Sequence, residues 1–422
     1  MRRSISEFIS DLETEDLGKI ERAISEISQH PERGLPIILK TIVKLINSPN
    51  RYIRYHAARA MRYIENPDSV EYLELLLDDE DEMVVSGAIT SLSYYDSLIP
   101  EKIVHKIIKI WYSAKSQDLL RTILNSFAKI NSSLTVSPII KKFEELPESI
   151  KPLAVDALGT IDHEKVHQFI LQHLDEQGTE LRLSLINAIG NLQIIKASTF
   201  LLESIEYEDD DDIIIALLRA IGKLKLRETI PLINDYCELD QSEDVRIASF
   251  QALGAIGSED ALPILETYTE DESSEISEAV VEAIGKIYCL QSYKILMDKV
   301  VNNPAESNLS LKNRAKELAE YIKEMVLNKE AHYELVDLLG SEEYSTRIKA
   351  SRKLIKLPSP PIKELILALE SNNEIKAAYA AEVLGILKEF SAADALKKIY
   401  QYKNGEVRAF AGWALNHMKL LK

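Results

Sequence analysis

The chain has 422 residues, 46% of them hydrophobic, so it can bury a sizeable core and is not expected to be disordered. Its 14 glycines and 14 prolines are too few for a turn-rich β-sandwich of this length. The net charge of −18 disfavours a nucleic-acid partner, and two cysteines cannot by themselves form a disulfide framework or a four-ligand zinc site.

The first residues give no indication of secretion, because residues 4–16 contain five acidic side chains and no apolar segment. The longest apolar run, residues 213–218, is too short to cross a bilayer. We therefore expect a soluble, cytoplasmic protein with no membrane insertion. Residues 1–48 show helical patterns and are expected to form an N-terminal helical cap.

Beyond the cap, one apolar position recurs every 30–36 residues. The residue before it is usually Ala or Ser, and in six units the residue after it is Gly. A small residue lets a neighbouring helix approach closely, and we expect the glycine to end the helix. The recurring positions, here called anchors, are Met61, Leu92, Phe127, Leu158, Ile189, Ile221, Leu253, Ile284, Leu318, Leu354, Leu384 and Leu415.

A second apolar helix begins about five residues after each anchor, in two units with a proline in its first turn, at Pro231 and Pro263. Acidic residues then precede the next first helix, as at Glu243 and Asp244, where they interact favourably with the helix dipole. Each unit is thus a helical hairpin of about 31 residues that cannot bury its apolar face alone. Stacking such units produces a continuous core, which predicts a solenoid.

The segment at residues 243–257, EDVRIASFQALGAIG, resembles a HEAT repeat, and more narrowly the short bacterial type first associated with phycobilisome lyases. The resemblance covers roughly residues 50–302 and 340–418. It implies an all-α fold, an α-solenoid in the form of a right-handed superhelix of about 12–13 helix pairs. We predict a cap at 1–48, a repeat array at 49–301, an atypical repeat or joint at 302–340, and C-terminal repeats at 341–422.

Charge is segregated along the chain: residues 101–143 carry 8 basic and 2 acidic groups, whereas residues 144–300 carry 12 and 32. The densest acidic runs lie between a second helix and the next first helix, so stacking should place them along one edge. These acids can act as helix caps and solubilising groups, or they can bind a basic partner. The candidate acidic edge comprises Asp78, Asp79, Asp81, Asp209, Asp210, Asp211 and Asp212.

A basic surface is predicted on second helices near the N-terminal end. Lys102, Lys106 and Lys109 are spaced i, i+4, i+7 and therefore share a helical face. The HEAT resemblance places second helices on the concave side of the solenoid, where this face is either a partner site or simply solvated. The candidate basic strip comprises Lys102, His105, Lys106, Lys109, Trp111, Tyr112, Lys141 and Lys142.

The first helix of another unit is also basic, and its side chains are expected on the convex side. These residues are Arg51, Arg54, Arg59 and Arg62.

Residues 163–167, HEKVH, match the H-E-x-x-H pattern of zinc metalloproteases. The repeat register places His163 in the turn between two helices, so the two imidazoles are not expected to share a face and no metal site is predicted. Neither a phosphate-binding loop nor a nucleophile–histidine arrangement is evident. We therefore predict no catalytic residue, no cofactor and no enzymatic activity.

The predicted function is a non-catalytic scaffold or adaptor that binds another protein along the concave face or the acidic edge. The repeat type leaves one alternative, a phycobilin lyase-like enzyme or chromophore-binding partner, which only the resemblance implies. The sequence identifies neither the partner nor the oligomeric state.

Overall fold

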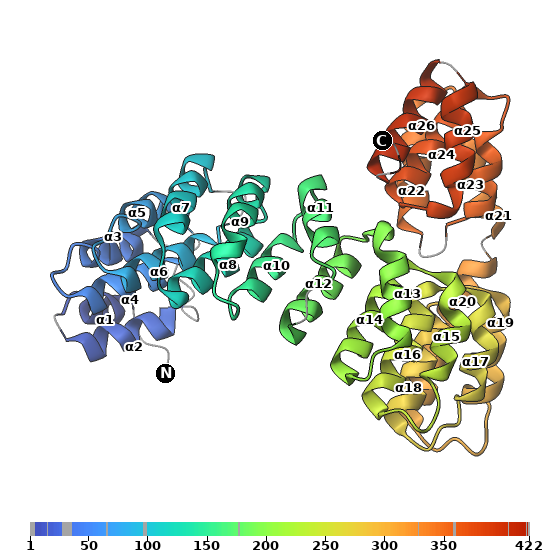
Figure 1. The fold of residues 1–422 in the computed structure, drawn as a ribbon, viewed down its shortest axis with the longest axis horizontal. Helices are drawn as coiled ribbons and strands as arrows, with labels where there is room; N and C mark the ends of the chain where they lie inside the picture. The colour runs from blue at the N-terminus through green and yellow to red at the C-terminus, as the bar shows by residue number, and fades with distance from the viewer. Residues whose placement is uncertain are drawn as a thin grey trace. The chain divides into compact units, whose positions relative to one another are not determined.

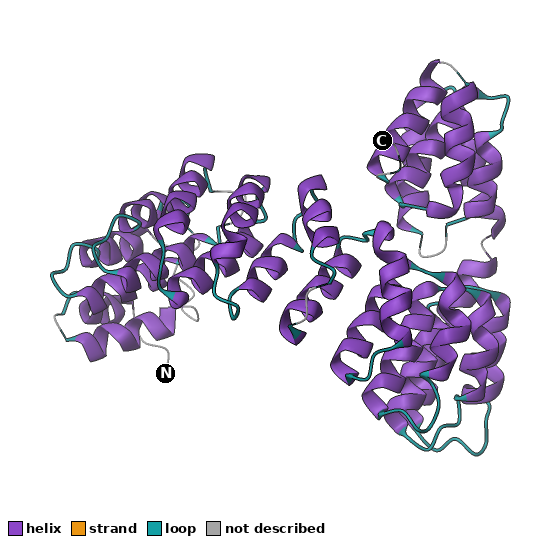
Figure 2. Cartoon of the chain, viewed as in Figure 1, coloured by secondary structure: helices purple, strands orange, loops and turns teal. Residues whose placement is uncertain are grey.

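The computed structural model describes residues 5–14, 16–27, 36–64, 66–95, 99–175, 178–327, 329–357, 360–403, 405–418 and 420. Within these residues the chain forms 26 α-helices and no strand, which confirms the predicted all-α solenoid (Figure 2). The helices divide into two compact units, Met1–Thr229 and Ile230–Lys422.

The first unit contains α1 (Ile5–Leu12), α2 (Leu17–Ile27), α3 (Pro36–Leu45), α4 (Arg51–Met61), α5 (Ser69–Leu76), α6 (Glu82–Leu92), α7 (Glu101–Ser113), α8 (Gln117–Ile130), α9 (Val136–Lys142), α10 (Lys151–Leu158), α11 (Glu164–Gln172), α12 (Thr179–Asn191), α13 (Ser198–Glu206) and α14 (Asp211–Leu224). The second unit contains α15 (Ile230–Asp235), α16 (Glu243–Ile256), α17 (Leu262–Thr267), α18 (Ser274–Gly285), α19 (Leu290–Ile295), α20 (Leu309–Leu327), α21 (Lys329–Leu338), α22 (Tyr344–Lys356), α23 (Ile362–Leu369), α24 (Glu374–Ile386), α25 (Ala393–Tyr402) and α26 (Gly405–His417).

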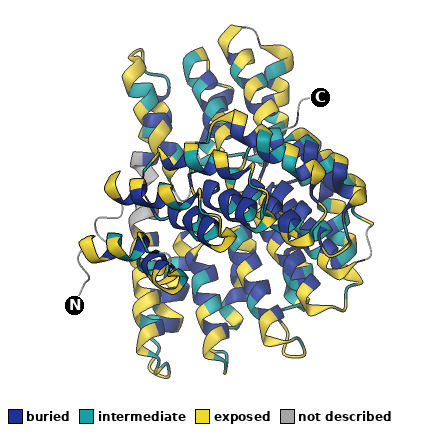
Figure 3. Ribbon diagram, turned by 90° about the vertical axis from the view of Figure 1, so that its left-hand side faces the viewer, coloured by how far each residue is buried: buried dark blue, intermediate teal, exposed yellow. Residues whose placement is uncertain are grey.

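The helices of each unit form two layers (Figure 1). In the first unit, α4 packs on α6, α6 on α8, and so on through α14, while the odd-numbered helices α7, α9 and α11 pack in a parallel row. In the second unit, α16 packs on α18 and α24 on α26, with α21, α23 and α25 in the other layer. Buried and exposed residues alternate along the helices (Figure 3), as expected when each helix turns one face to the core.

The anchors occupy the core. Eleven of the twelve have side chains that are at most 1% exposed, which confirms the register of the repeat. The exception is Leu318 in α20, which is half-buried. This unit is the one whose sequence is atypical.

The prediction that these glycines end the helices holds only in part. Gly159 caps the C-terminus of α10 and Gly285 is the last residue of α18, whereas the other four glycines lie inside their helices. Gly254 lies inside α16, and a Cβ built on it would be 2.6 Å from the Cα of Ala283 in α18. Gly159 and Ala188 approach in the same way. Close packing of one first helix on the next therefore explains these glycines, and the left-handed turn that ends α16 is made three residues later, at Gly257 with φ +70°.

The predicted joint at 302–340 begins after α19, which continues as a π-helical segment, Leu296–Val301. Farther along, a hydrophobic cluster runs from Val336 to Met418 and forms the core of α21 to α26. The predicted domain boundaries and the right-handed superhelix stay predictions.

Candidate protein-interaction surfaces

The basic strip has three lysines on α7, Lys102, Lys106 and Lys109, and two on α9, Lys141 and Lys142. The lysines of α7 are partly neutralised by acids of α5 and of the loop that follows it. The Nζ of Lys102 is 2.8 Å from Oε2 of Glu74, and this hydrogen bond raises the pKa of Lys102. The Nζ of Lys106 is 2.6 Å from Oδ2 of Asp78 and also donates to the carbonyl of Glu74 at 2.9 Å. Two of the three lysines on this face are therefore paired within the chain.

Two residues assigned to the strip are buried, which corrects their placement on a partner surface. Trp111 is fully buried, and its indole N–H donates to the carbonyl of Pro138 at 3.2 Å. Lys142 is 8% exposed and its Nζ donates to the carbonyls of Trp111 and Ala114 at 2.6 and 2.9 Å. Burial lowers the pKa of Lys142. The exposed members of the strip are Lys102, His105, Lys109, Tyr112 and Lys141.

Asp79 was predicted on the acidic edge but is not exposed there, because it forms a buried ion pair with Arg54. The side chains are 8% and 10% exposed, and Arg54 donates to both carboxylate oxygens at 2.7 and 2.8 Å. Burial alone would raise the pKa of Asp79, but hydrogen bonds from Arg54 and from the backbone N–H of Asp81 lower it. Arg54 was expected on the convex side and instead joins α4 to the loop before α6.

Equivalent pairs occur elsewhere in the chain. Arg246 lies 2.6 Å from Asp271, with both side chains 8% exposed, and Arg182 lies 2.5 Å from Glu208. We call these pairs clasps, because each joins a first helix to the loop before the next first helix. An acid recurs 25 or 26 residues after each of these arginines, and this spacing could have revealed the clasps in the sequence.

Other acids of the edge cap helices. Asp81 caps α6 by accepting from the N–H of Met83, and it also lies 3.1 Å from Arg51. Asp210 caps α14 by accepting from the N–H groups of Asp212 and Ile213. Asp78 pairs with Lys106 yet keeps 72% of its side-chain surface exposed.

Three acids of the edge are exposed and carry no internal ion pair. Among the described residues, no cation lies in salt-bridge range of Asp209, Asp211 or Asp212. Beside them Tyr207 is 81% exposed. The end of α13 and the start of α14 therefore present an uncompensated acidic surface with one aromatic side chain.

A pocket of about 480 Å³ lies between α18 and α20. In this atypical unit the residue before the anchor is Glu317 instead of a small residue. A Cβ built on Gly285 of α18 would lie 2.7 Å from the side chain of Leu318 in α20. The glycine of the preceding unit therefore faces the anchor itself and not a small residue before it, and Leu318 stays only half-buried at the pocket.

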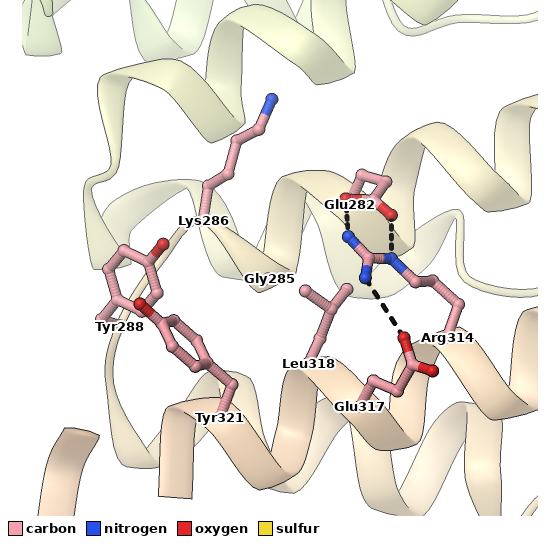
Figure 4. Close-up of a pocket in the computed structure, with 8 residues that line it drawn as sticks. All are labelled: Glu282, Gly285, Lys286, Tyr288, Arg314, Glu317, Leu318 and Tyr321. Atoms are coloured by element: carbon pink, nitrogen blue, oxygen red, sulfur yellow. Dashed lines mark hydrogen bonds and ion pairs between the residues drawn. The ribbon is translucent and has the colours of Figure 1, made fainter. Parts of the chain in front are cut away.

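The charged side chains of this pocket are mostly paired (Figure 4). Arg314 donates to Glu282 at 2.5 and 3.1 Å and lies 3.3 Å from Glu317. The rings of Tyr288 and Tyr321 meet edge to face, with centroids 5.9 Å apart. Because one guanidinium engages both carboxylates, the pocket presents tyrosine surface and no free acid–base pair.

The H-E-x-x-H segment is placed as the register predicted. His163 caps α11, its Nδ1 accepting from the N–H of Lys165 at 3.0 Å, and Nε2 of His167 lies 3.0 Å from Asp162. In the ranges that the structure describes, no group of three or more His, Cys, Asp or Glu side chains is arranged to hold a metal ion. None of the described helices is both long enough and apolar enough to cross a membrane.

The family model described as HEAT repeats matches residues 38–126 and 198–285. No curated protein sequence gives a significant match. A crystal structure of importin beta is similar to the chain with a TM-score of 0.54 and 10% identity, covering 98% of this chain and 66% of that protein. The chain thus spans about two thirds of importin beta, and at this identity the likeness shows the fold alone.

Weaker similarities involve a structure of YibA from Escherichia coli, with a TM-score of 0.45, 17% identity and coverage of 60% of this chain and 92% of that one. The CpcE–CpcF complex of phycocyanin lyase from Nostoc gives a TM-score of 0.36 and 14% identity, over 61% of this chain and 96% of that one. Scores this low carry no argument about function. The repeat match, the buried anchors and the stacked helical hairpins together identify the chain as an α-solenoid that contains HEAT repeats.

Proposed function

We propose that the chain is a non-catalytic protein-interaction scaffold that binds a basic segment of a partner protein along its acidic edge. The observation that carries the proposal is the absence of an internal cation beside Asp209, Asp211 and Asp212, among the residues that the structure describes. Lys102 and Lys106, by contrast, already have carboxylate partners. An uncompensated charge can accept a partner without first breaking an internal ion pair.

The composition of this surface suits a basic peptide. Tyr207 is 81% exposed, and an exposed aromatic ring can pack against the aliphatic stem and charged end of Lys or Arg. Three neighbouring carboxylates would attract such a segment from solution and increase its association rate. A stacked solenoid supplies extended surface for such contacts without a catalytic group.

The test uses a variant that removes three charges but keeps the helix cap. Asp209→Asn, Asp211→Asn and Asp212→Asn are combined, and Asp210 is retained because it caps α14. The matched control changes three exposed first-turn acids on α24, α25 and α26 to their amides: Glu374→Gln, Asp394→Asn and Glu406→Gln. Both variants change the net charge equally, so the comparison separates a local site from general attraction.

Titration with a labelled Lys/Arg-rich peptide should show about tenfold weaker binding to the acidic-edge variant, since each exposed ion pair contributes roughly 0.2–1 kcal/mol. The control variant should bind within about twofold of the original chain, and added salt should reduce the difference. Equal losses in the two variants would show that the peptide senses only net charge, and the proposal would then fail.

A further inference from the structure

Cations and tyrosines alternate along the C-terminal ends of α4, α6 and α8. Tyr63, Tyr94 and Lys129 each lie two residues after an anchor, so they occupy the same position in three successive units. Arg62 lies one residue after the first of these anchors. We call Arg59, Arg62, Tyr63, Tyr94 and Lys129 the cationic row.

The tyrosines hold the cations close together. The guanidinium of Arg62 lies 4.4 Å from the ring centroid of Tyr63 and 5.7 Å from that of Tyr94. The Nζ of Lys129 lies 4.3 Å from the same Tyr94 centroid, and Tyr94 is 54% exposed. Arg62 and Lys129 are therefore within about 10 Å of each other, a separation comparable with the Debye length at 0.1 M salt. Their positive charges act together on any group placed above Tyr94.

These cations have no anionic partner in the described part of the chain. Arg54 in the same helix is held by Asp79, whereas no carboxylate is within salt-bridge range of Arg59, Arg62 or Lys129. The Nε of Arg62 is buried and makes no hydrogen bond. Positive charge is favourable at a helix C-terminus, but the dipole does not satisfy a buried donor or remove the repulsion between neighbouring cations. An incoming anion would relieve the repulsion between the cations.

We propose that the cationic row binds a carboxylate-rich segment of a partner protein. Arginine and lysine supply charge-assisted hydrogen bonds to carboxylates, and the exposed face of Tyr94 supplies a surface for the peptide backbone or an apolar side chain. A short acidic segment fits better than a long polyanion, because Asp78, Glu80 and Asp81 lie at the opposite end of α6. At 1.5 Å per residue that end is only about 16 Å away, so an extended nucleic acid would be repelled there. This inference does not depend on the acidic edge as a binding site.

The test measures binding of a labelled oligoglutamate peptide to the full chain, with a labelled single-stranded oligonucleotide as the competing probe. The double variant Arg62→Gln/Lys129→Gln should bind the peptide about tenfold more weakly. The matched control, Lys115→Gln/Lys196→Gln, removes the same charge from exposed positions of the first unit and should bind normally. Lys129→Gln alone tests the row without touching the half-buried Arg62 and should give an intermediate loss.

A second pair of variants examines Tyr94. Tyr94→Phe keeps the ring that both cations contact and should retain peptide binding, whereas Tyr94→Ala should weaken it. Equal peptide affinity for the original chain and the double variant would overturn the proposal. Tighter binding of the oligonucleotide than of the peptide, lost in the same double variant, would also overturn it and assign the row to nucleic acid.

Discussion

We predict that Arg54→Met destabilises the contact between α4 and α6 by about 3–5 kcal/mol, the usual cost of removing one partner from a buried ion pair. The side chains of Arg54 and Asp79 are 10% and 8% exposed and share two hydrogen bonds of 2.7 and 2.8 Å. Methionine roughly preserves the length and apolar contacts of the arginine stem. It leaves the carboxylate of Asp79 with the backbone N–H of Asp81, at 2.9 Å, as its hydrogen-bond donor.

Amide hydrogen exchange is the suitable assay, because a stacked repeat protein can open locally without unfolding as a whole. A loss of about 3–5 kcal/mol corresponds to exchange about 10²- to 10⁴-fold faster for the protected amides of α4 and α6. Lys44→Met is the control: Lys44 lies 2.7 Å from Glu13, but the two side chains are 61% and 48% exposed. Breaking that pair should cost less than about 1 kcal/mol.

A double variant separates the buried charge from the lost contact. Arg54→Met combined with Asp79→Leu leaves no unpaired ion in the core, so it should be more stable than Arg54→Met alone. If Arg54→Met and Lys44→Met accelerate exchange equally, the assignment of the Arg54–Asp79 pair as a buried clasp is refuted.

Leu253→Asp should destabilise the chain by several kcal/mol, because the side chain of Leu253 is fully buried. The control Asp211→Asn, at an exposed position, should change stability by roughly half a kcal/mol. Equal melting temperatures for the two variants would contradict the repeat register. Burial raises the pKa of the Cys237 thiol to about 12, so the folded chain has almost no reactive thiolate at pH 8. Mass spectrometry should therefore find Cys237 modified by iodoacetamide only when the chain is unfolded, and labelling of the native chain would refute this. Burial also lowers the pKa of His56 below 6.5, so the unfolded chain binds more protons near that pH and stability should fall as the pH drops through and below 6.5. Urea titrations should show a weaker pH dependence for His56→Gln; an unchanged dependence would exclude this contribution.

Local patterns in the sequence determined the repeat and its register. The spacing of the anchors, the small residues before them and the acids at helix starts predicted stacked helical hairpins, and residues such as Leu253 are buried as expected. These features follow from the periodicity of a helix and from the hydrogen-bonding needs of its ends, which involve residues only a few positions apart. The atypical unit was also visible, because it opens with Asn302-Asn303-Pro304 and its long polar helix lacks the Ala-Leu-Gly signature.

The tertiary structure decided which polar side chains are exposed and unpaired. Lys102 and Lys106 appeared to form a free basic face, but their acidic partners come from α5 and the loop after it, 28 residues away for each pair. Trp111 is covered by the neighbouring unit, and Asp79 is neutralised by Arg54, 25 residues earlier. Where a glycine follows the anchor, the next helix limits the space for a side chain, as Ala283 does at Gly254. Burial and pairing depend on which side chains the adjacent unit brings to the contact, and helical periodicity within one unit contains no information about that neighbour.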